Sequence, residues 1–356
     1  MIEADRTIDK TTQKEAKCKG GTPLKVTLKD IAQRCGVSVN TVSLALRNMP
    51  SVRQETRDSI LRAAEELGYS PQKSKAEMRN IGLVSTGARL RDSYFYMSFH
   101  QRILSTAYDH NYNMMVFKGS TCDVDPKELR RIFEANSIAG IIILGDMDER
   151  IASKVAQCGI PVVAIGTRYQ NLAVCVVTED NFQGGLLAVK HLRSRGASKI
   201  GFLGSPRHST GFMERFQGFL GAMTHFSMPV DPEHLVLDLD SADVYNYEQM
   251  LTALRRRNSL PEAFLCANDN IALIGTKALL SMGLNVPQDV SLIGFDNTVM
   301  GKMAIPSMTS VDVHCEAQAE ACVEKLISFI TSGRSSKERI LLPVTLAEGE
   351  SVREFF

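Results

Sequence analysis

The spacing of apolar residues along this chain changes near residue 80. Between about residues 26 and 70, apolar side chains recur at helical spacing in three short segments separated by glycine, serine or proline. From residue 81 onward, short continuous apolar runs alternate with amphipathic segments of about ten residues or more. The pattern therefore predicts a small all-α domain followed by a larger α/β domain.

Nine apolar runs in the larger region are predicted to be strands, in two sets with a break near residues 178–198. Helical patterns lie between them, for example at Gly184–Arg195 and Ile271–Met282. This alternation favours two parallel sheets with helices on both faces, and ligands of such folds bind beyond the carboxyl ends of the strands. We therefore expect two lobes with a cleft between them. The predicted strands are 81–85, 114–117, 139–144, 162–165, 174–177, 199–203, 235–237, 263–266 and 290–294.

Three short helices are expected in the N-terminal region. Thr27 and Asp30 form a capping-box-like start for the first helix, and Gly36 ends it. Ser38 caps the second helix, which is predicted over residues 39–47, and a third helix follows. A tight Gly-Val-Ser turn between the first two helices is typical of a helix-turn-helix.

The outward face of the second helix carries mainly short, uncharged side chains. Asn40 suits the N6/N7 edge of adenine in the major groove, and Leu44 suits a thymine methyl group. Thr41, Ser43 and Arg47 suit phosphates, which set the docking register without reading the base sequence. From the pattern alone, a three-helix bundle without a nucleic-acid ligand stays open as the alternative.

The distribution of charge adds to this prediction. The whole chain has a net charge of +1, but residues 1–80 contain 15 Lys and Arg against 10 Asp and Glu, and the remainder contains 26 against 30. A basic head on a slightly acidic body favours contact between the head alone and a polyanion. Residues 1–23 are polar and lack apolar periodicity, so we expect a disordered tail there.

Several other classes of protein are disfavoured by the sequence. No run approaches the roughly 18 apolar residues that cross a bilayer, and the first 21 residues lack the apolar core of a secretory signal. We therefore expect a cytoplasmic protein without a membrane partner. The eight cysteines are scattered, without zinc-binding spacing, and are interpreted as small buried hydrophobes. No hydrolase, P-loop or metalloprotease motif occurs, so we predict no enzyme, catalytic residue, metal or cofactor.

The N-terminal region closely resembles the DNA-binding head of the LacI/GalR repressor family. The likeness is carried by VTLKDIAQRCGVSVNTVSLALRN at residues 26–48 and by LGYSP at 67–71. It implies a helix-turn-helix domain over residues 24–70. Leu44 stands where the family commonly has arginine, and Arg47 where it commonly has asparagine, so we expect the usual docking mode with a different base sequence read. The implied DNA-binding residues are Thr27, Ser38, Val39, Asn40, Thr41, Ser43, Leu44, Arg47 and Tyr69.

Residues 71–80 form a joint that is several residues shorter than is usual in this family. It lacks the leucine that the family's hinge helix inserts into the minor groove. Met78 is one candidate for such a wedge, since methionine can unstack a base step. The other interpretation, which we favour, is a plain linker whose Lys73, Lys75 and Arg79 lie near phosphates.

Residues 81–352 resemble the sensor domain of the same family, which shares the fold of periplasmic sugar-binding proteins. The resemblance implies two parallel-sheet subdomains that bind a small-molecule effector through Arg215, Asn268 and Asp296. Asp180, at a predicted strand end, is a further candidate. The aromatic residues Tyr94 and Tyr96 are expected either to stack on a ligand ring or to pack in the core. The matching stretches include AGIII at 139–143, DNFQGG at 180–185, ERFQGF at 214–219, AND at 267–269 and VPQDVSLIGFD at 286–296.

The sequence therefore predicts a homodimeric transcription regulator, with a repressor favoured, whose two heads read a palindromic operator on double-stranded DNA. We expect its effector to be a sugar or sugar derivative that shifts the two lobes and so moves the heads. A nucleobase effector is the nearest alternative. A solute-binding protein of a transporter is a second alternative, which the helix-turn-helix disfavours.

Overall fold

The computed structural model divides the chain into two compact units, Met1–Glu77 and Met78–Phe356. It confirms the predicted fold class, because a small helical unit precedes an α/β unit with two mainly parallel sheets. The predicted tail at 1–23 and residues 71–78 of the predicted joint lie outside the described residues. The structure describes residues 26–46, 52–69, 79–86, 93–167, 169, 171–172, 174–237 and 246–355.

Three helices form the first unit: α1 (Leu28–Cys35), α2 (Val39–Leu46) and α3 (Gln54–Glu66). The turn from α1 to α2 depends on local contacts. Gly36 adopts a φ of +65°, which costs glycine little, and the Ser38 hydroxyl accepts a hydrogen bond from the backbone N–H of Thr41 at 3.0 Å. The helices enclose a small core of Ile31, Ala32, Val42, Ala45, Val52, Ile60, Ala63 and Ala64.

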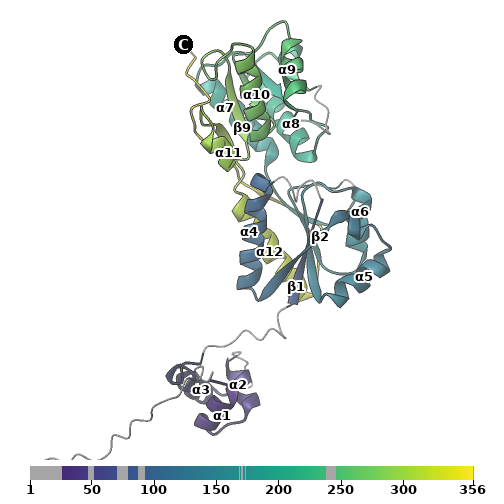
Figure 1. Ribbon diagram of the computed structural model, residues 1–356, viewed down its shortest axis with the longest axis vertical. Helices are drawn as coiled ribbons and strands as arrows, with labels where there is room; N and C mark the ends of the chain where they lie inside the picture. Colours follow the sequence, from purple (N-terminus) through teal and green to yellow (C-terminus); the bar gives the residue numbers. More distant parts are fainter. Residues whose placement is uncertain are drawn as a thin grey trace, which may run out of the picture. The chain divides into compact units, whose positions relative to one another are not determined.

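The second unit has two lobes, and the first is built on a six-stranded parallel sheet. Its strands lie in the order β11-β5-β4-β3-β1-β2. Helices α4 and α12 cover one face and α5 and α6 the other (Figure 1). Strand β3 is buried along its whole length, as expected of a central parallel strand. The elements of this N-lobe are β1 (Arg79–Ser85), α4 (Ser93–Asp109), β2 (Tyr112–Lys118), the 3-10 turn η1 (Gly119–Cys122), α5 (Pro126–Ala135), β3 (Ile138–Leu144), α6 (Glu149–Gln157), β4 (Val162–Ile165), β5 (Cys175–Glu179), α12 (Cys315–Ser332) and β11 (Arg339–Leu342).

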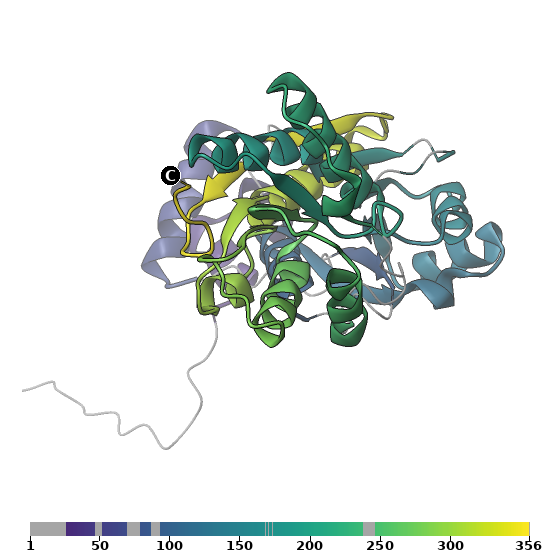
Figure 2. The same ribbon diagram turned by 90° about the horizontal axis from the view of Figure 1, so that it is seen from above.

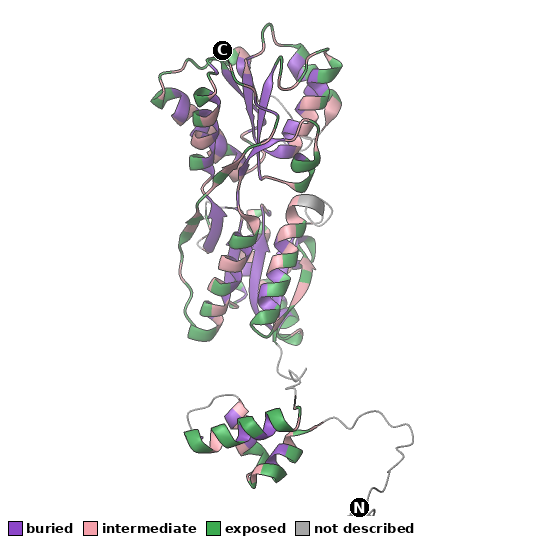
Figure 3. Cartoon of the chain, turned by 90° about the vertical axis from the view of Figure 1, so that its left-hand side faces the viewer, coloured by how far each residue is buried: buried purple, intermediate pink, exposed green. Residues whose placement is uncertain are grey.

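The second lobe, the C-lobe, has a six-stranded sheet in the order β12-β10-β9-β8-β6-β7. Helices lie on both sides of its strands (Figure 2). In Figure 3 the central strands of both lobes are coloured as buried, whereas the outer helix surfaces are exposed. The elements of the C-lobe are α7 (Asn181–Ser194), β6 (Ile200–Leu203), α8 (Thr210–His225), the 3-10 turn η2 (Pro232–His234), β7 (Leu235–Val236), α9 (Tyr247–Arg255), β8 (Ala263–Cys266), α10 (Asp269–Ser281), β9 (Ser291–Phe295), α11 (Val299–Met303), β10 (Thr309–Asp312) and β12 (Thr345–Ala347).

The chain passes between the lobes three times, after β5, after β10 and after β11. All nine predicted strands have a counterpart among the described residues, which form twelve strands. The sequence interpretation missed β10, β11 and β12. Both sheets are mainly parallel, and β12 pairs with β10 in the antiparallel direction at the edge of the C-lobe sheet. The strand β11 returns to the N-lobe, so neither lobe is a continuous stretch of sequence.

Other sequence expectations can be compared with the described residues. No helix among them is long and apolar enough to cross a membrane. The structure leaves seven cysteines unpaired, and five of these are buried: Cys122, Cys158, Cys175, Cys266 and Cys322. The described part of the chain holds no group of three or more His, Cys, Asp or Glu side chains placed to hold a metal ion.

Candidate functional site

The first candidate site is the outer surface of α2. Val39 and Asn40 are exposed, with 40% of Val39 accessible, whereas Thr41 and Ser43 are half-buried. Leu44 is also half-buried and packs against the core of the head, so it is less available than the outward-face prediction implied. Arg47 lies outside the described residues. The surface presents short side chains on one helix, which suits the width of a DNA major groove.

Three further predicted DNA-binding residues have structural partners in the head. The carboxylate of Asp30 accepts hydrogen bonds from the backbone N–H and the hydroxyl of Thr27, both at 2.7 Å. These bonds lower the pKa of Asp30. The Ser38 hydroxyl lies 2.8 Å from that of Thr41, and half-buried Tyr69 packs against the helices at the end of α3. Thr27, Ser38 and Tyr69 therefore stabilise the helix ends, whatever contact they make with DNA.

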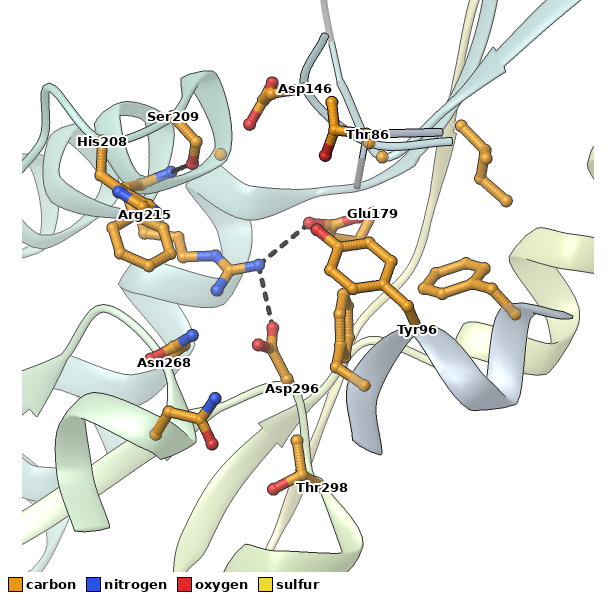
Figure 4. Close-up of a pocket in the computed structure, with 18 of the residues that line it drawn as sticks. Thr86, Tyr96, Asp146, Glu179, His208, Ser209, Arg215, Asn268, Asp296 and Thr298 are labelled. Carbon is orange, nitrogen blue, oxygen red and sulfur yellow. Dashed lines mark hydrogen bonds and ion pairs between the residues drawn. The ribbon is translucent and has the colours of Figure 1, made fainter. Parts of the chain in front are cut away.

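The second candidate site is a cavity of about 680 Å³ between the two lobes (Figure 4). Its walls come from the carboxyl ends of strands in both sheets and from the first turns of α8 and α10, as the sequence predicted for a two-lobed fold. Arg215, Asn268, Asp296 and Tyr96 all line it. The cavity therefore unites four of the six residues proposed as effector contacts.

Arg215 is buried at the centre of this wall, and each of its guanidinium nitrogens has a protein partner. Its Nε donates to Asn181 Oδ1 and its Nη1 to the carbonyl of Ala267, both at 2.7 Å. Its Nη2 lies 3.1 Å from Glu179 Oε1 and 3.0 Å from Asp296 Oδ1. The guanidinium also stacks 3.8 Å from the centroid of the Phe295 ring. Because these partners lie at or near the ends of several different strands, together they fix the orientation of the Arg215 side chain.

Two glycines allow Arg215 to reach this position. A Cβ atom at Gly185 of α7 would lie 2.4 Å from the backbone oxygen of Arg215 on α8, and one at Gly218 would lie 2.1 Å from the oxygen of Phe182. Because neither backbone could yield without separating the helices, only glycine permits this close packing. Gly185 and Gly218 therefore serve the packing of α7 against α8 at the site, whereas a Cβ at Gly184 would meet the ring of Phe295.

Asp296 occupies an unusual backbone conformation at the end of β9. Its φ is +101°, a region that side chains rarely adopt and that is enriched at functional sites. The buried carboxylate of Asp269 holds the following loop, since it accepts from the backbone N–H of Thr298 at 2.6 Å and from the hydroxyl of Ser310 at 2.6 Å. Asp269 thus positions Asp296, although it does not line the cavity.

Three carboxyl groups, those of Glu179, Asp269 and Asp296, lie near the single guanidinium of Arg215. Burial raises the pKa of Asp296 to about 8, against the lowering effect of Arg215, and the neighbouring carboxylates of Asp269 and Glu179 raise it further. Burial also raises the pKa of Asp269. A single guanidinium therefore stabilises the ionised form of these carboxyl groups only in part.

The other predicted effector contacts have different surroundings. Asn268 is the N-cap of α10 and accepts a hydrogen bond from the N–H of Ile271 at 3.0 Å while lining the cavity. Asp180 caps α7 by accepting from the N–H of Gln183 at 2.9 Å and is not a lining residue. The side chain of Tyr94 lies outside the described residues. Tyr96 lines the cavity and also packs against Phe95, with ring centroids 5.1 Å apart, and against the N-lobe core; its stacking on a ligand ring stays a prediction.

Some cavity residues were not singled out from the sequence. Glu179 adjoins the proposed contact Asp180, and only the pairing with Arg215 identifies it as part of the site. Asp146, which accepts a hydrogen bond from the hydroxyl of Thr167, and His208 also line the cavity. Asp146 directly follows the predicted strand 139–144 and Gly145, so the strand-end rule that selected Asp296 could have found it.

Comparison with protein families gives two matches on this chain. Residues 27–72 match the model described as bacterial regulatory proteins, lacI family, and residues 189–352 match the periplasmic binding protein-like domain. One curated relative is the NTD biosynthesis operon regulator NtdR of Bacillus subtilis (strain 168). It is 28% identical over 334 residues, which span 91% of this chain and 99% of that protein.

Solved structures of similar fold come from transcription regulators. The complex of transcriptional regulator CelR with cellobiose matches with a TM-score of 0.67 at 24% identity, over 92% of this chain and 100% of that one. The lac repressor dimer bound to operator and the anti-inducer ONPF matches with a TM-score of 0.66 at 24% identity, over 93% and 100%. At this identity the structures establish the shared fold.

Proposed function

This chain belongs to the LacI family of bacterial regulatory proteins, and from this premise we propose that it is a homodimeric repressor controlled by a sugar-like effector. Regulators of this family bind DNA and are not enzymes. The observation that carries the finer proposal is the cavity in which Arg215, Asn268 and Asp296 converge from separate strand and helix ends. Buried carboxylate, amide and guanidinium groups match the hydroxyls of a sugar, which both donate and accept hydrogen bonds.

Two features support a sugar over a nucleobase. The relative CelR was solved with cellobiose bound, which makes a carbohydrate a reasonable first candidate for a cavity of the same fold. The polar residues Thr86, Asp146, Ser209 and Thr298 line the cavity on several sides, so a ligand with hydroxyls around its ring finds partners in many directions. A flat nucleobase between Tyr96 and the C-lobe stays the second candidate, because aromatic side chains line one wall.

Exposed apolar side chains on α4 and α11 support the homodimer. On α4, Met97, Leu104 and Tyr108 are 46%, 48% and 53% exposed, and the spacing of these residues places them on one helix face. On and after α11, Met303 is 74% and Ile305 95% exposed. Both helices lie on the same side of the second unit (Figure 1). We propose that a second copy of this chain covers this side, because a C2 interface repeats one patch on both subunits.

In the proposed mechanism, each head occupies one half-site of a palindromic operator, and effector binding changes the angle between the lobes. The three chain passages between the lobes transmit that change to the dimer. The effector alters operator affinity only as far as it prefers one lobe arrangement, and such coupling is typically about 1–3 kcal/mol. This mechanism requires the DNA-binding surface of the head and the effector cavity to be present in the same protein molecule.

The experiment for the DNA half of the proposal is selection of bound sites from a random duplex library at fixed salt, because phosphate contacts make affinity salt-dependent. A palindrome with a constant half-site spacing is the expected result. A single half-site would contradict a dimer on DNA, and no enrichment would contradict operator binding itself.

The experiment for the cavity combines a thermal-shift panel of sugars and purines with titration of the selected operator. A sugar that raises Tm should also change operator affinity, and Asp296→Asn should remove that response while leaving operator affinity without effector nearly unchanged. If Asp296→Asn instead abolishes DNA binding, Asp296 serves the fold and not the effector response. Asp231→Asn, at the exposed cap of the 3-10 turn η2 and not among the cavity-lining residues, is the matched control.

A further inference from the structure

The part of the cavity around Arg215 has more buried carboxyl groups than cations. Glu179 of the N-lobe and Asp296 of the C-lobe each lie within 3.1 Å of Arg215 Nη2, and both are buried, as is Asp269. Arg215 is the one cationic side chain, apart from His208, among the described residues that line the cavity. Three carboxyl groups therefore share one guanidinium.

Arg215 is also poorly available to an anionic ligand. Its Nε and Nη1 donate to Asn181 and Ala267, and its Nη2 serves the two carboxylates. A ligand carboxylate or phosphate would have to replace these buried acceptors and would lie beside Glu179 and Asp296. Like charges at such distances in a poorly solvated site repel one another strongly, because little water screens them.

The helix N-termini at this end do not reverse the conclusion. The first turns of α8 and α10 face the cavity, and helix N-termini attract anions. However, the hydroxyl of Ser209 and the amide oxygen of Asn268 already accept from the first-turn N–H groups of Phe212 and Ile271. Buried Asp269, at the first position of α10, supplies a negative charge there as well.

We propose that the effector presents hydrogen-bond donors, as hydroxyl or protonated amine groups, to the Glu179–Arg215–Asp296 end of the cavity, and carries no carboxylate or phosphate there. This inference rests on the proposed effector role of the cavity. The carboxyl oxygens of Glu179 and Asp296 accept hydrogen bonds from such groups, and a protonated amine would also favour the ionised forms of these buried carboxyl groups. Tyr96 and Phe95 on α4 add aromatic faces that attract a cation. A ring bearing an amine should therefore bind at least as tightly as its neutral counterpart.

The first test compares three variants of the full chain without any ligand. Glu179→Gln and Asp296→Asn each remove one buried carboxyl group, whereas Arg215→Gln leaves both of these carboxyl groups without their cation. We expect Arg215→Gln to lower Tm strongly, and each carboxylate variant to lower it by less than about a third as much or to raise it. Equal losses in all three variants would show that every charge is needed and would overturn the proposal. Asn181→Asp, which adds a fourth carboxylate beside Arg215, should lower Tm.

The second test uses matched ligands: glucose, galactose and mannose with their 2-amino, 6-carboxylate and 6-phosphate derivatives. The expected order of affinity in calorimetry is amine at least equal to neutral, and both at least about tenfold tighter than the anions, the equivalent of about 1.4 kcal/mol. An anionic derivative that binds most tightly would overturn the proposal. If no sugar of the panel binds, the Tm comparison of the three variants decides whether the proposal stands.

Operator titration separates this inference from the proposed function. Wild-type protein that binds its operator and responds to an anionic effector would contradict the inference and leave the regulator intact. Protein that binds no operator, or whose operator affinity no ligand changes, would contradict the proposed function. In Glu179→Gln, the affinity for an anionic sugar derivative should increase relative to the affinity for the neutral sugar. If the ratio of these two affinities is the same as in the wild type, the result counts against the inference.

Discussion

The outer surface of α2 and the cavity between the lobes both depend on polar side chains, but the chain assembles them in different ways. Val39, Asn40, Thr41 and Ser43 follow one another on a single helix, and their directions follow from its periodicity. Arg215, Glu179 and Asp296 come from distant positions and are buried against one another. The effects of substitutions on the α2 surface should therefore be nearly independent of one another, whereas a substitution in the cavity should alter the interactions of several neighbouring residues.

We expect the largest difference between the cavity and the α2 surface in how the free energy of unfolding depends on pH. Burial raises the pKa of Asp296 to about 8, so the folded protein keeps a proton that the unfolded chain releases near its ordinary pKa of about 3.9. The stability from this proton is present below about pH 4 and is lost as pH rises through about 8. Relative to Asp296→Asn, the wild-type free energy of unfolding should therefore fall between pH 5 and 8, by at most about 1.4 kcal/mol per pH unit.

Urea unfolding at several pH values measures this difference. The variant Asn40→Ala on α2 is the control, and its stability should follow the wild-type pH dependence. Parallel curves for wild type and Asp296→Asn would mean that Asp296 does not titrate in this range.

The next largest effect is expected from Gly185→Ala. The added Cβ would lie 2.4 Å from the backbone oxygen of Arg215, so α7 and α8 must separate, at a cost of about 2–3 kcal/mol. Displacement of Arg215 should also weaken the effector response. Gly275→Ala on α10 is the matched control, because its Cβ would meet side chains at 3.7 Å, an ordinary contact, and should leave stability unchanged or slightly higher. Similar unfolding midpoints for the two variants would disprove the role of close packing at Gly185.

On the α2 surface, Asn40→Ala should cost about 1–3 kcal/mol at one base pair and relax the preference there. Binding to a set of operators with each position substituted measures this effect. Because Asn40 is exposed, the stability of the protein and the effector response should not change. A loss of affinity that is uniform across all sequences would assign Asn40 to phosphate contact.

The smallest effect is expected from Ser38→Ala, which removes the cap at the start of α2. Loss of the hydrogen bond from the N–H of Thr41 should cost about 1 kcal/mol. Hydrogen exchange of α2 amides in the full chain should become about fivefold faster, while amides of β3 in the N-lobe stay unchanged. A change that also reaches β3 would show that the two units are not independent in stability.

The head was largely predictable because its determinants are local. Thr27, Gly36 and Ser38 mark helix ends by conformations that only a few residue types favour. The apolar side chains at helical spacing in the three segments pack into one core, with Ile31, Val42 and Ile60 contributed by one helix each. Leu44 departs from this agreement, since it packs partly against the core. A leucine at the edge of an apolar stripe can face either the core or the solvent, so helical periodicity alone does not predict its orientation.

The cavity was predictable only in part, because its geometry depends on the order of strands in space. The resemblance to LacI/GalR regulators named Arg215, Asn268 and Asp296, and the structure brings them to one cavity. Glu179 was missed because nothing local distinguishes it from the neighbouring Asp180, which caps α7. The strands β10 to β12 were missed because they are short, and the β11 burial pattern alternates between exposed and half-buried residues.

The three passages between the lobes also constrain how the protein is made. The N-lobe sheet ends with β11, and the C-lobe strand β10 pairs with β12, so neither lobe is complete until almost the entire chain has left the ribosome. The helical head, in contrast, needs only its first 70 or so residues. During synthesis, a folded head would thus precede the cavity that we propose controls it. A premature stop before residue 339 would therefore yield a head without the complete cavity through which we propose that an effector acts.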